Sequence, residues 1–155
     1  MNSKLITAIL VGAVVLGSVS TVVTGCGGSS HSNTVDQTQT LSNLKAVGLA
    51  LAQYTEDYDE QLPSGTTSAA IDSQLLSYKH DSSIFIDPNN KVPFAWNASL
   101  SGKSPDIFPD VSLIMTFYDE QPPVQDSIPV LLLNGQAHTE TSAQFAQLKS
   151  TSGIP

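Results

Sequence analysis

The hydrophobic residues divide the chain into an apolar N-terminal run, a short polar stretch and a longer body with periodic patterns. The run covers residues 5–23, nineteen residues without a charge that follow Lys4. At ~1.5 Å per residue, a helix of this length just reaches across a bilayer, whereas a secretory signal normally has a shorter apolar core behind its basic start. Gly12 and Gly17 weaken the second half of the run. The pattern alone therefore leaves a membrane helix and a secretory signal both open.

The body opens with apolar residues at helical spacing. A stripe with steps of three and four is formed by Leu41, Leu44, Val47, Leu51, Tyr54 and Tyr58. This period places the stripe on one face of a helix. Thr38 or Thr40 can cap the start, and Pro63 followed by Ser64 and Gly65 stops any continuation. The pattern predicts an amphipathic helix over residues 39–60.

The rest of the body predicts short elements. We expect a short helix over residues 69–80, an extended piece over 82–90 and a strand that starts near Ser112. Phe94 and Trp96 are expected to anchor an edge of the core, because large aromatic rings contribute much buried area.

The clearest hairpin is IPVLLL, then Asn134-Gly135, then QAHTET. Asn-Gly suits the two positive-φ positions of a type I′ turn. The segment SAQFAQLK after it predicts a short closing helix or turn, with Ser142 as its cap. One long helix followed by an antiparallel meander indicates an α+β fold, in which an N-terminal amphipathic helix packs on one face of a small sheet.

Composition narrows the classes of partner. The formal net charge is -8, and the chain has no arginine. It therefore has few groups that could neutralise phosphates, which disfavours nucleic-acid binding. The single cysteine cannot form an internal disulfide.

That cysteine stands directly after the apolar run, in the sequence VVTGC, and GGSSHSN follows it. VVTGC resembles the lipobox of bacterial lipoproteins. The resemblance implies that Cys26 receives a diacylglycerol, that the signal is cut before Cys26, and that the new N terminus is acylated by chains such as palmitate. Each buried methylene contributes ~0.8 kcal/mol, so several chains hold a protein firmly. Gly27, rather than Asp, favours the outer membrane in a cell that has one. The alternative is an uncleaved membrane helix with an incidental cysteine.

A second resemblance covers residues 41–148. SNLKAVGLALAQYTEDYDEQLP is similar to the start of the soluble half of type II secretion pseudopilin-like and type IV pilin-like proteins. LLSYKHDSSIFIDP, FAWNASLSG and IPVLLLNGQAHTETSAQFAQL continue the likeness in order, although Asp87 stands where many relatives have cysteine. The resemblance implies a pilin-like fold. The usual prepilin site inside the apolar helix is absent, and the lipobox takes its place. Cleavage at Cys26 would remove the half that packs a filament.

Candidate chemistry is sparse. Glu56, Asp57, Asp59 and Glu60 end the predicted helix and match no calcium loop, so a solvated acidic end is the preferred interpretation. His138 and Glu140 alternate on a predicted strand and share a face, but no third metal ligand is evident. His80 beside Asp81 fits a capping position. No catalytic set is found, because a G-x-S-x-G elbow and a placed Ser/His/Asp group are both missing.

The pilin-like resemblance also implies calcium, which major pseudopilins commonly hold in the loop before their last strands. The comparable region here offers Asp106, Asp110, Asp119 and Asp126, with Glu120 beside them. Their spacing gives no clear ligand set. They remain the candidate metal residues, and no other cofactor is expected.

We therefore divide the chain into a signal peptide (1–25), a flexible tether (26–38), a pilin-like α+β domain (39–149) and a tail (150–155). The expected function is non-enzymatic: a lipid-anchored protein of the cell envelope, linked to secretion or pilus machinery. Its partners would be the membrane, through the anchor, and envelope or secretion-system proteins. The alternative is an envelope lipoprotein that binds a small ligand or calcium, with the acidic loops or a pocket near Trp96 as the site.

Overall fold

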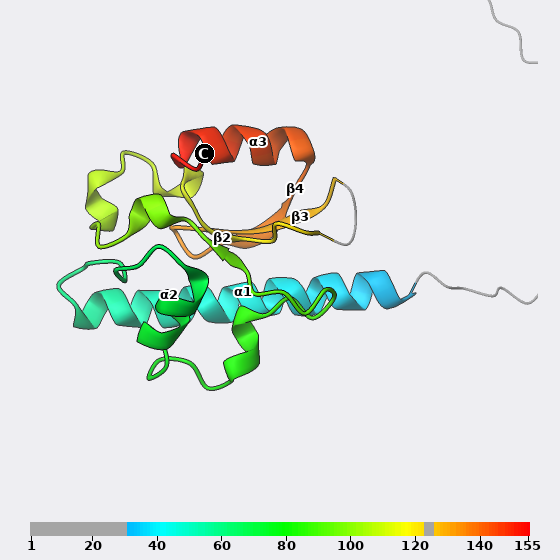
Figure 1. Ribbon diagram of the computed structural model, residues 1–155. Coiled ribbons are helices and arrows are strands. Elements are labelled where there is room, and N and C mark those ends of the chain that lie inside the picture. Colours follow the sequence, from blue (N-terminus) through cyan, green and yellow to red (C-terminus); the bar gives the residue numbers. More distant parts are fainter. Residues whose placement is uncertain (1–30, 123–125) are drawn as a thin grey trace, which may run out of the picture.

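The computed structural model describes residues 31–122 and 126–155, and in residues 31–36 it describes only the backbone. The fold is α+β, with one helix on each face of a four-stranded antiparallel sheet (Figure 1). Helix α1 (His31–Asp57) covers one face and α3 (Ser142–Thr151) covers the other, while the short α2 (Ser68–Gln74) lies beside α1. The predicted fold class is confirmed at this level. The long helix is not at the N terminus of the chain, because it begins at His31. Its first turns occupy part of the stretch expected to be a tether.

The sheet is a simple meander with strand order β1-β2-β3-β4. Its members are β1 (Ala95–Trp96), β2 (Met115–Tyr118), β3 (Ile128–Leu132) and β4 (Ala137–Glu140). The predicted hairpin is confirmed as β3 and β4, but its turn is not type I′. Only Gly135 has positive φ (81°), and its N–H donates to the Leu132 carbonyl at 2.9 Å. The chain thus turns over Leu133 and Asn134, and Gly135 follows in the left-handed region that suits glycine.

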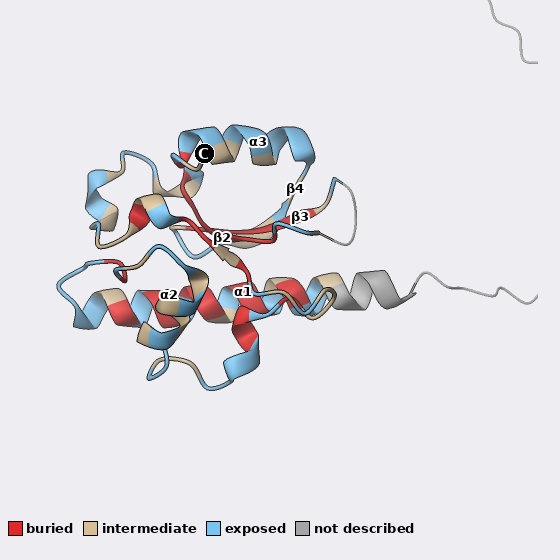
Figure 2. Cartoon of the chain, viewed as in Figure 1, coloured by how far each residue is buried: buried red, intermediate tan, exposed pale blue. Residues whose placement is uncertain are grey.

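Strand β3 is buried along its whole length, because both faces of the sheet are covered (Figure 2). Leu131 joins the cluster beneath α1, whereas Val130 and Leu132 join a second cluster beneath α3. Partners from α3 and the C terminus are Phe145, Leu148 and Ile154. A strand between two apolar layers needs no polar face, which explains the continuous IPVLLL run.

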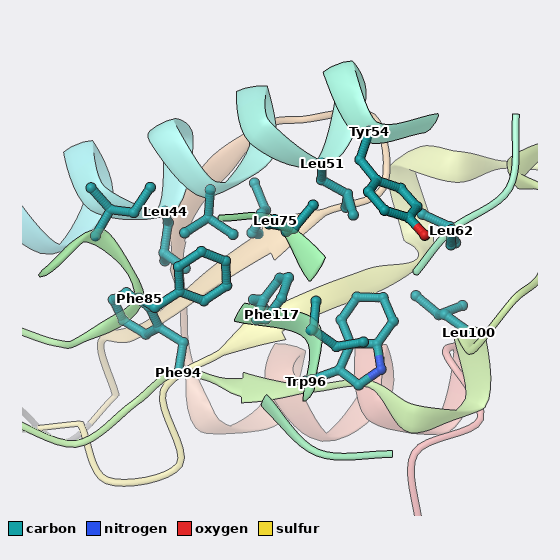
Figure 3. Packing of buried hydrophobic residues seen from close by; sticks show 14 of the residues in the cluster. Leu44, Leu51, Tyr54, Leu62, Leu75, Phe85, Phe94, Trp96, Leu100 and Phe117 are labelled. Atoms are coloured by element: carbon teal, nitrogen blue, oxygen red, sulfur yellow. The ribbon is translucent and has the colours of Figure 1, made fainter. Parts of the chain in front are cut away.

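The main core lies between α1 and the sheet, and Figure 3 shows its packing. Leu44, Val47, Leu51 and Tyr54 are buried as the helical stripe predicts. Tyr58 is 53 % exposed, which corrects the prediction, because α1 ends at Asp57. The Tyr58 ring instead stacks on Tyr54, with centroids 4.2 Å apart.

The aromatic anchors are placed as expected. Phe94 and Trp96 are both buried. The Trp96 indole N–H donates to the Gly65 carbonyl at 3.0 Å, and its ring centroid lies 5.0 Å from that of Phe117. This bond ties the loop before α2 to the sheet, so the indole satisfies its only donor while its rings stay in the core.

Side-chain caps explain two local corrections. Residues 82–85, predicted as extended, form a 3-10 helix, because an Asp81 carboxylate oxygen accepts from the Ser83 N–H at 2.8 Å. The expected strand near Ser112 starts only at Met115, since Asp110 caps a 3-10 turn over Val111–Leu113 in the same way. Caps of this kind supply partners for backbone donors that lack one within the turn.

The C-terminal segment is held by a buried polar residue. Asn97 is 1 % exposed, and its amide nitrogen donates to the carbonyls of Met115 (2.9 Å) and Ser152 (3.1 Å). The Ser152 hydroxyl accepts from the Met115 N–H at 2.8 Å. The stretch 150–155, expected to be a tail, thus contains the end of α3 and a residue bound to the sheet.

Candidate functional site

The four candidate calcium residues have separate roles. Asp106 lies exposed in the short 3-10 helix Pro105–Ile107. Asp110 accepts from Ser112, and this hydrogen bond lowers the pKa of its carboxyl. Asp126 accepts from the Ser142 N–H at 3.2 Å, and its contact with Ser142 lowers its pKa as well. Within residues 31–122 and 126–155, no three His, Cys, Asp or Glu side chains form a group that could hold a metal ion.

Asp119, the fourth candidate, belongs to a buried pair with Asp87. Asp87 is 0 % and Asp119 3 % exposed. Asp87 Oδ1 accepts from the Thr40 hydroxyl of α1 and from the backbone and side-chain nitrogens of Asn89, each at 2.9 Å. Asp119 Oδ1 accepts from the Gln121 N–H at 2.9 Å. The pair therefore joins three parts of the chain: α1, the turn after the first 3-10 helix, and the segment after β2.

One oxygen of each carboxyl group lacks a donor. Oδ2 of Asp87 and Oδ2 of Asp119 are both buried without a hydrogen-bond donor. Burial, together with the neighbouring carboxyl of Asp87, raises the pKa of Asp119 to about 6, since two adjacent carboxyl groups resist double ionisation. A proton on one of them gives the other a donor. The sequence indicated Asp119 as a candidate metal residue and Asp87 only as a departure from the pilin-like pattern, because nothing local reveals that the two carboxyl groups meet.

A groove runs beside the C-terminal half of α1. We call it the α1 groove. Its apolar end has a volume of about 170 Å³. The lining residues come from α1, from the segments that follow it and from the β3–β4 turn: Gly48, Leu51, Ala52, Thr55, Leu62, Pro105, Leu132, Leu133, Asn134 and Gly135.

The other end of the α1 groove is acidic. Ala52, Thr55 and Pro105 also line an adjoining hollow of about 410 Å³, whose remaining residues are Glu56, Glu60 and Asp106. These three carboxylates are exposed, and none forms an ion pair with a described residue. The solvated acidic end predicted for α1 is confirmed by exposure, but the hollow beside it was not foreseen, because Pro105 and Asp106 come from a distant part of the chain.

A neighbouring carboxylate is used differently. Asp57 accepts from the Tyr78 hydroxyl at 2.8 Å, and this hydrogen bond is the main reason that the pKa of Tyr78 rises to about 12. Asp57 therefore ties the end of α1 to the segment after α2 and lines neither end of the groove.

The remaining candidates take structural positions. His138 and Glu140 do share a face of β4, as predicted, and their side chains meet at 2.6 Å between Nε2 and Oε1. His80 is exposed and follows Tyr78 and Lys79 beside the capping residue Asp81. Cys26 and the predicted signal lie outside the described residues. Among the helices of the part described, none combines the length and the apolar character needed to span a membrane.

Comparison with known proteins adds no assignment. No family model matches the chain, and neither a curated protein nor a solved structure shows significant similarity to it.

Proposed function

We propose that this protein is a bacterial lipoprotein of the cell envelope whose pilin-like domain acts through contacts with other proteins and catalyses no reaction. Acyl groups on Cys26 hold it at a membrane, the outer one in a cell with two. Its partners are envelope proteins, among them components of a secretion or pilus machine.

One observation carries the proposal: the only cysteine of the chain follows a charged start and an apolar run, at the end of VVTGC. The position of this cysteine between an apolar run and a Gly/Ser-rich stretch requires a chemical reason. Thioether attachment of a lipid gives it one, and two or more acyl chains make membrane binding stable.

The pilin-like part of the proposal is supported by the resemblance of residues 41–148 to pilin-like sequences and by a long helix packed on an antiparallel meander. A filament is built by an apolar helix that continues from the domain. Cleavage before Cys26 leaves no such helix, so contacts must come from the surface of the domain itself.

The small-ligand alternative receives less support. The apolar end of the α1 groove, at about 170 Å³, is below the roughly 300 Å³ at which ligand cavities commonly start, and the larger adjoining hollow, at about 410 Å³, is lined by exposed carboxylates, whereas such cavities are mostly apolar. Trp96 is buried and its indole nitrogen already donates to the Gly65 carbonyl, so this N–H is not free to bind a ligand.

The test is mass spectrometry of the mature N terminus from membranes. We expect a chain that begins at Cys26 and carries a diacylglycerol thioether. Cys26→Ser should leave the signal uncut and remove the lipid. Ser29→Ala, three residues farther on, is the matched control and should be processed like wild type. A Cys26→Ser protein that is still cut and still membrane-bound would refute the proposal.

A further inference from the structure

We infer that the α1 groove is a docking site for a protein segment that presents an aliphatic side chain next to a lysine or arginine. This inference deepens the proposed function by naming the chemistry of the partner, and it rests on that function only for the partner's location in the envelope.

The first argument is the shape of the groove and the kind of atoms that line it. At its apolar end the lining includes Leu51 of α1, Leu62 after it and Leu133 of the hairpin, and a Cβ at Gly135 would meet no atom within 4 Å. Water in such a hollow finds few polar partners, so an aliphatic side chain replaces it favourably.

The second argument is charge. Glu56, Glu60 and Asp106 surround the adjoining end, and no described cation pairs with them. Helix α1 has no basic residue in its last turn, although its terminal carbonyls add negative potential there. The end of the helix therefore keeps an unbalanced negative field beside an apolar hollow, and a cationic group on a partner would balance it.

The same charges argue against other occupants. Anionic lipid headgroups and nucleic-acid phosphates would meet carboxylates. A second copy of this chain carries a net charge of -8, with only six lysines and no arginine, so the two copies would repel each other overall. Cleavage before Cys26 would leave residues 26–30 ahead of α1, and these contain no lysine, so the N-terminal segment of the processed chain would lack the cation that the groove would balance.

The geometry also suggests variants that test the shape of the groove and its charge separately. Ala52 is exposed and lines both ends, so Ala52→Phe fills the groove from the surface of α1 without disturbing the core. Gln53, the next residue, is exposed and lines neither end, which makes Gln53→Phe the matched control. Glu60→Gln removes a lining charge. Asp59→Asn removes the neighbouring charge outside the lining and keeps a residue that tolerates the positive φ of 50° found there.

The experiment measures fluorescence anisotropy of labelled eight-residue peptides with the full-length chain in a neutral detergent. The probes alternate leucine with lysine, leucine with glutamate, or serine with lysine. We expect saturable binding of the leucine–lysine peptide, and at least about tenfold weaker binding of the other two. Ala52→Phe should weaken binding about tenfold and Glu60→Gln about two- to fivefold, the range for one exposed charge pair. Gln53→Phe and Asp59→Asn should each change it less than twofold.

Three results would overturn the inference: no binding of the leucine–lysine peptide up to about 1 mM, equal binding of the leucine–glutamate peptide, or binding that Ala52→Phe leaves intact. Sedimentation of the same samples provides one further outcome, because a dimer that Ala52→Phe dissociates would assign the groove to a second copy. The Cys26→Ser protein separates this inference from the proposed lipid anchor. It should bind the peptide like wild type, whatever mass spectrometry shows about lipid on Cys26.

Discussion

Asparagine in place of Asp119 is expected to stabilise the protein at neutral pH, although it replaces a buried residue that makes hydrogen bonds. The new side chain keeps an oxygen that can accept from the Gln121 N–H, as Asp119 Oδ1 does at 2.9 Å. Its amide nitrogen would occupy the place of Oδ2 and donate to Asp87 Oδ2, which is buried without a donor. The substitution thus removes one of two adjacent buried charges and supplies the missing donor.

The magnitude follows from the pKa of Asp119, which rises from 3.8 to about 6 in the folded protein. The folded state therefore keeps a proton at pH values at which the unfolded chain has lost it. This stabilising contribution is complete below about pH 3.8 and is lost as the pH rises through 6. The difference of roughly 2.2 pH units (6 minus 3.8), at about 1.4 kcal/mol each, gives a loss of ~3 kcal/mol between acid and neutral pH. Asparagine does not titrate, so Asp119→Asn should gain about 1–3 kcal/mol over wild type at pH 7.5 and little at pH 4.5.

The assay is urea unfolding of both proteins at several pH values between 4.5 and 7.5. The difference between the two free energies of unfolding cancels the titration of the other carboxyl groups. Glu120→Gln, which changes the exposed neighbouring carboxylate, is the control and should follow wild type at every pH. A variant that is no more stable than wild type at pH 7.5, or a difference that is the same at both ends of the range, would refute the account of a charge-strained pair.

Three further predictions concern stability. Asn97→Ala should lower the free energy of unfolding in urea by about 1–3 kcal/mol, because it removes the Asn97 amide donor from the Met115 carbonyl and one of the two donors from the Ser152 carbonyl, which keeps the Ser99 hydroxyl. Gly48→Ile should cost about 1–3 kcal/mol by thermal unfolding, since even a Cβ at that position lies 3.1 Å from Leu131 Cδ1, whereas the neighbouring exposed Leu49→Ile should be nearly neutral. Chelator and calcium should give the same unfolding midpoint, because no three His, Cys, Asp or Glu side chains of the described residues form a group that could hold a metal ion; a higher midpoint with calcium would establish a bound ion.

Much of the fold could be read from local patterns. The helical stripe identified the buried face of α1, and Asn134-Gly135 located the β3–β4 hairpin, because period and turn chemistry depend on neighbouring residues only. Local patterns failed where a side chain decided between two backbone forms. Asp81 and Asp110 each cap a 3-10 turn where an extended segment was expected. Such a cap depends on the conformation of one side chain, which strand propensity does not predict.

The candidate site could be predicted from the sequence to a much smaller extent. Two strands and three 3-10 turns separate Asp87 from Asp119 along the chain, and only the assembled fold places the two residues together. The α1 groove likewise needs residues of the helix, of the Pro105 turn and of the hairpin at one place. Contacts between distant segments depend on packing, which a linear pattern does not contain.

Sequence alone determined the candidate anchor at Cys26, the acidic balance, the face of α1 that is buried and the position of the last hairpin. Tertiary structure decided that α3 covers the second face of the sheet, so that β3 has no polar side, and that two carboxyl groups share a dry interior. The physical reason is the distance along the sequence over which each property is determined. Helical period, turn propensity and charge depend on a few neighbouring residues, whereas burial and pKa depend on residues that are distant in sequence and adjacent in the fold.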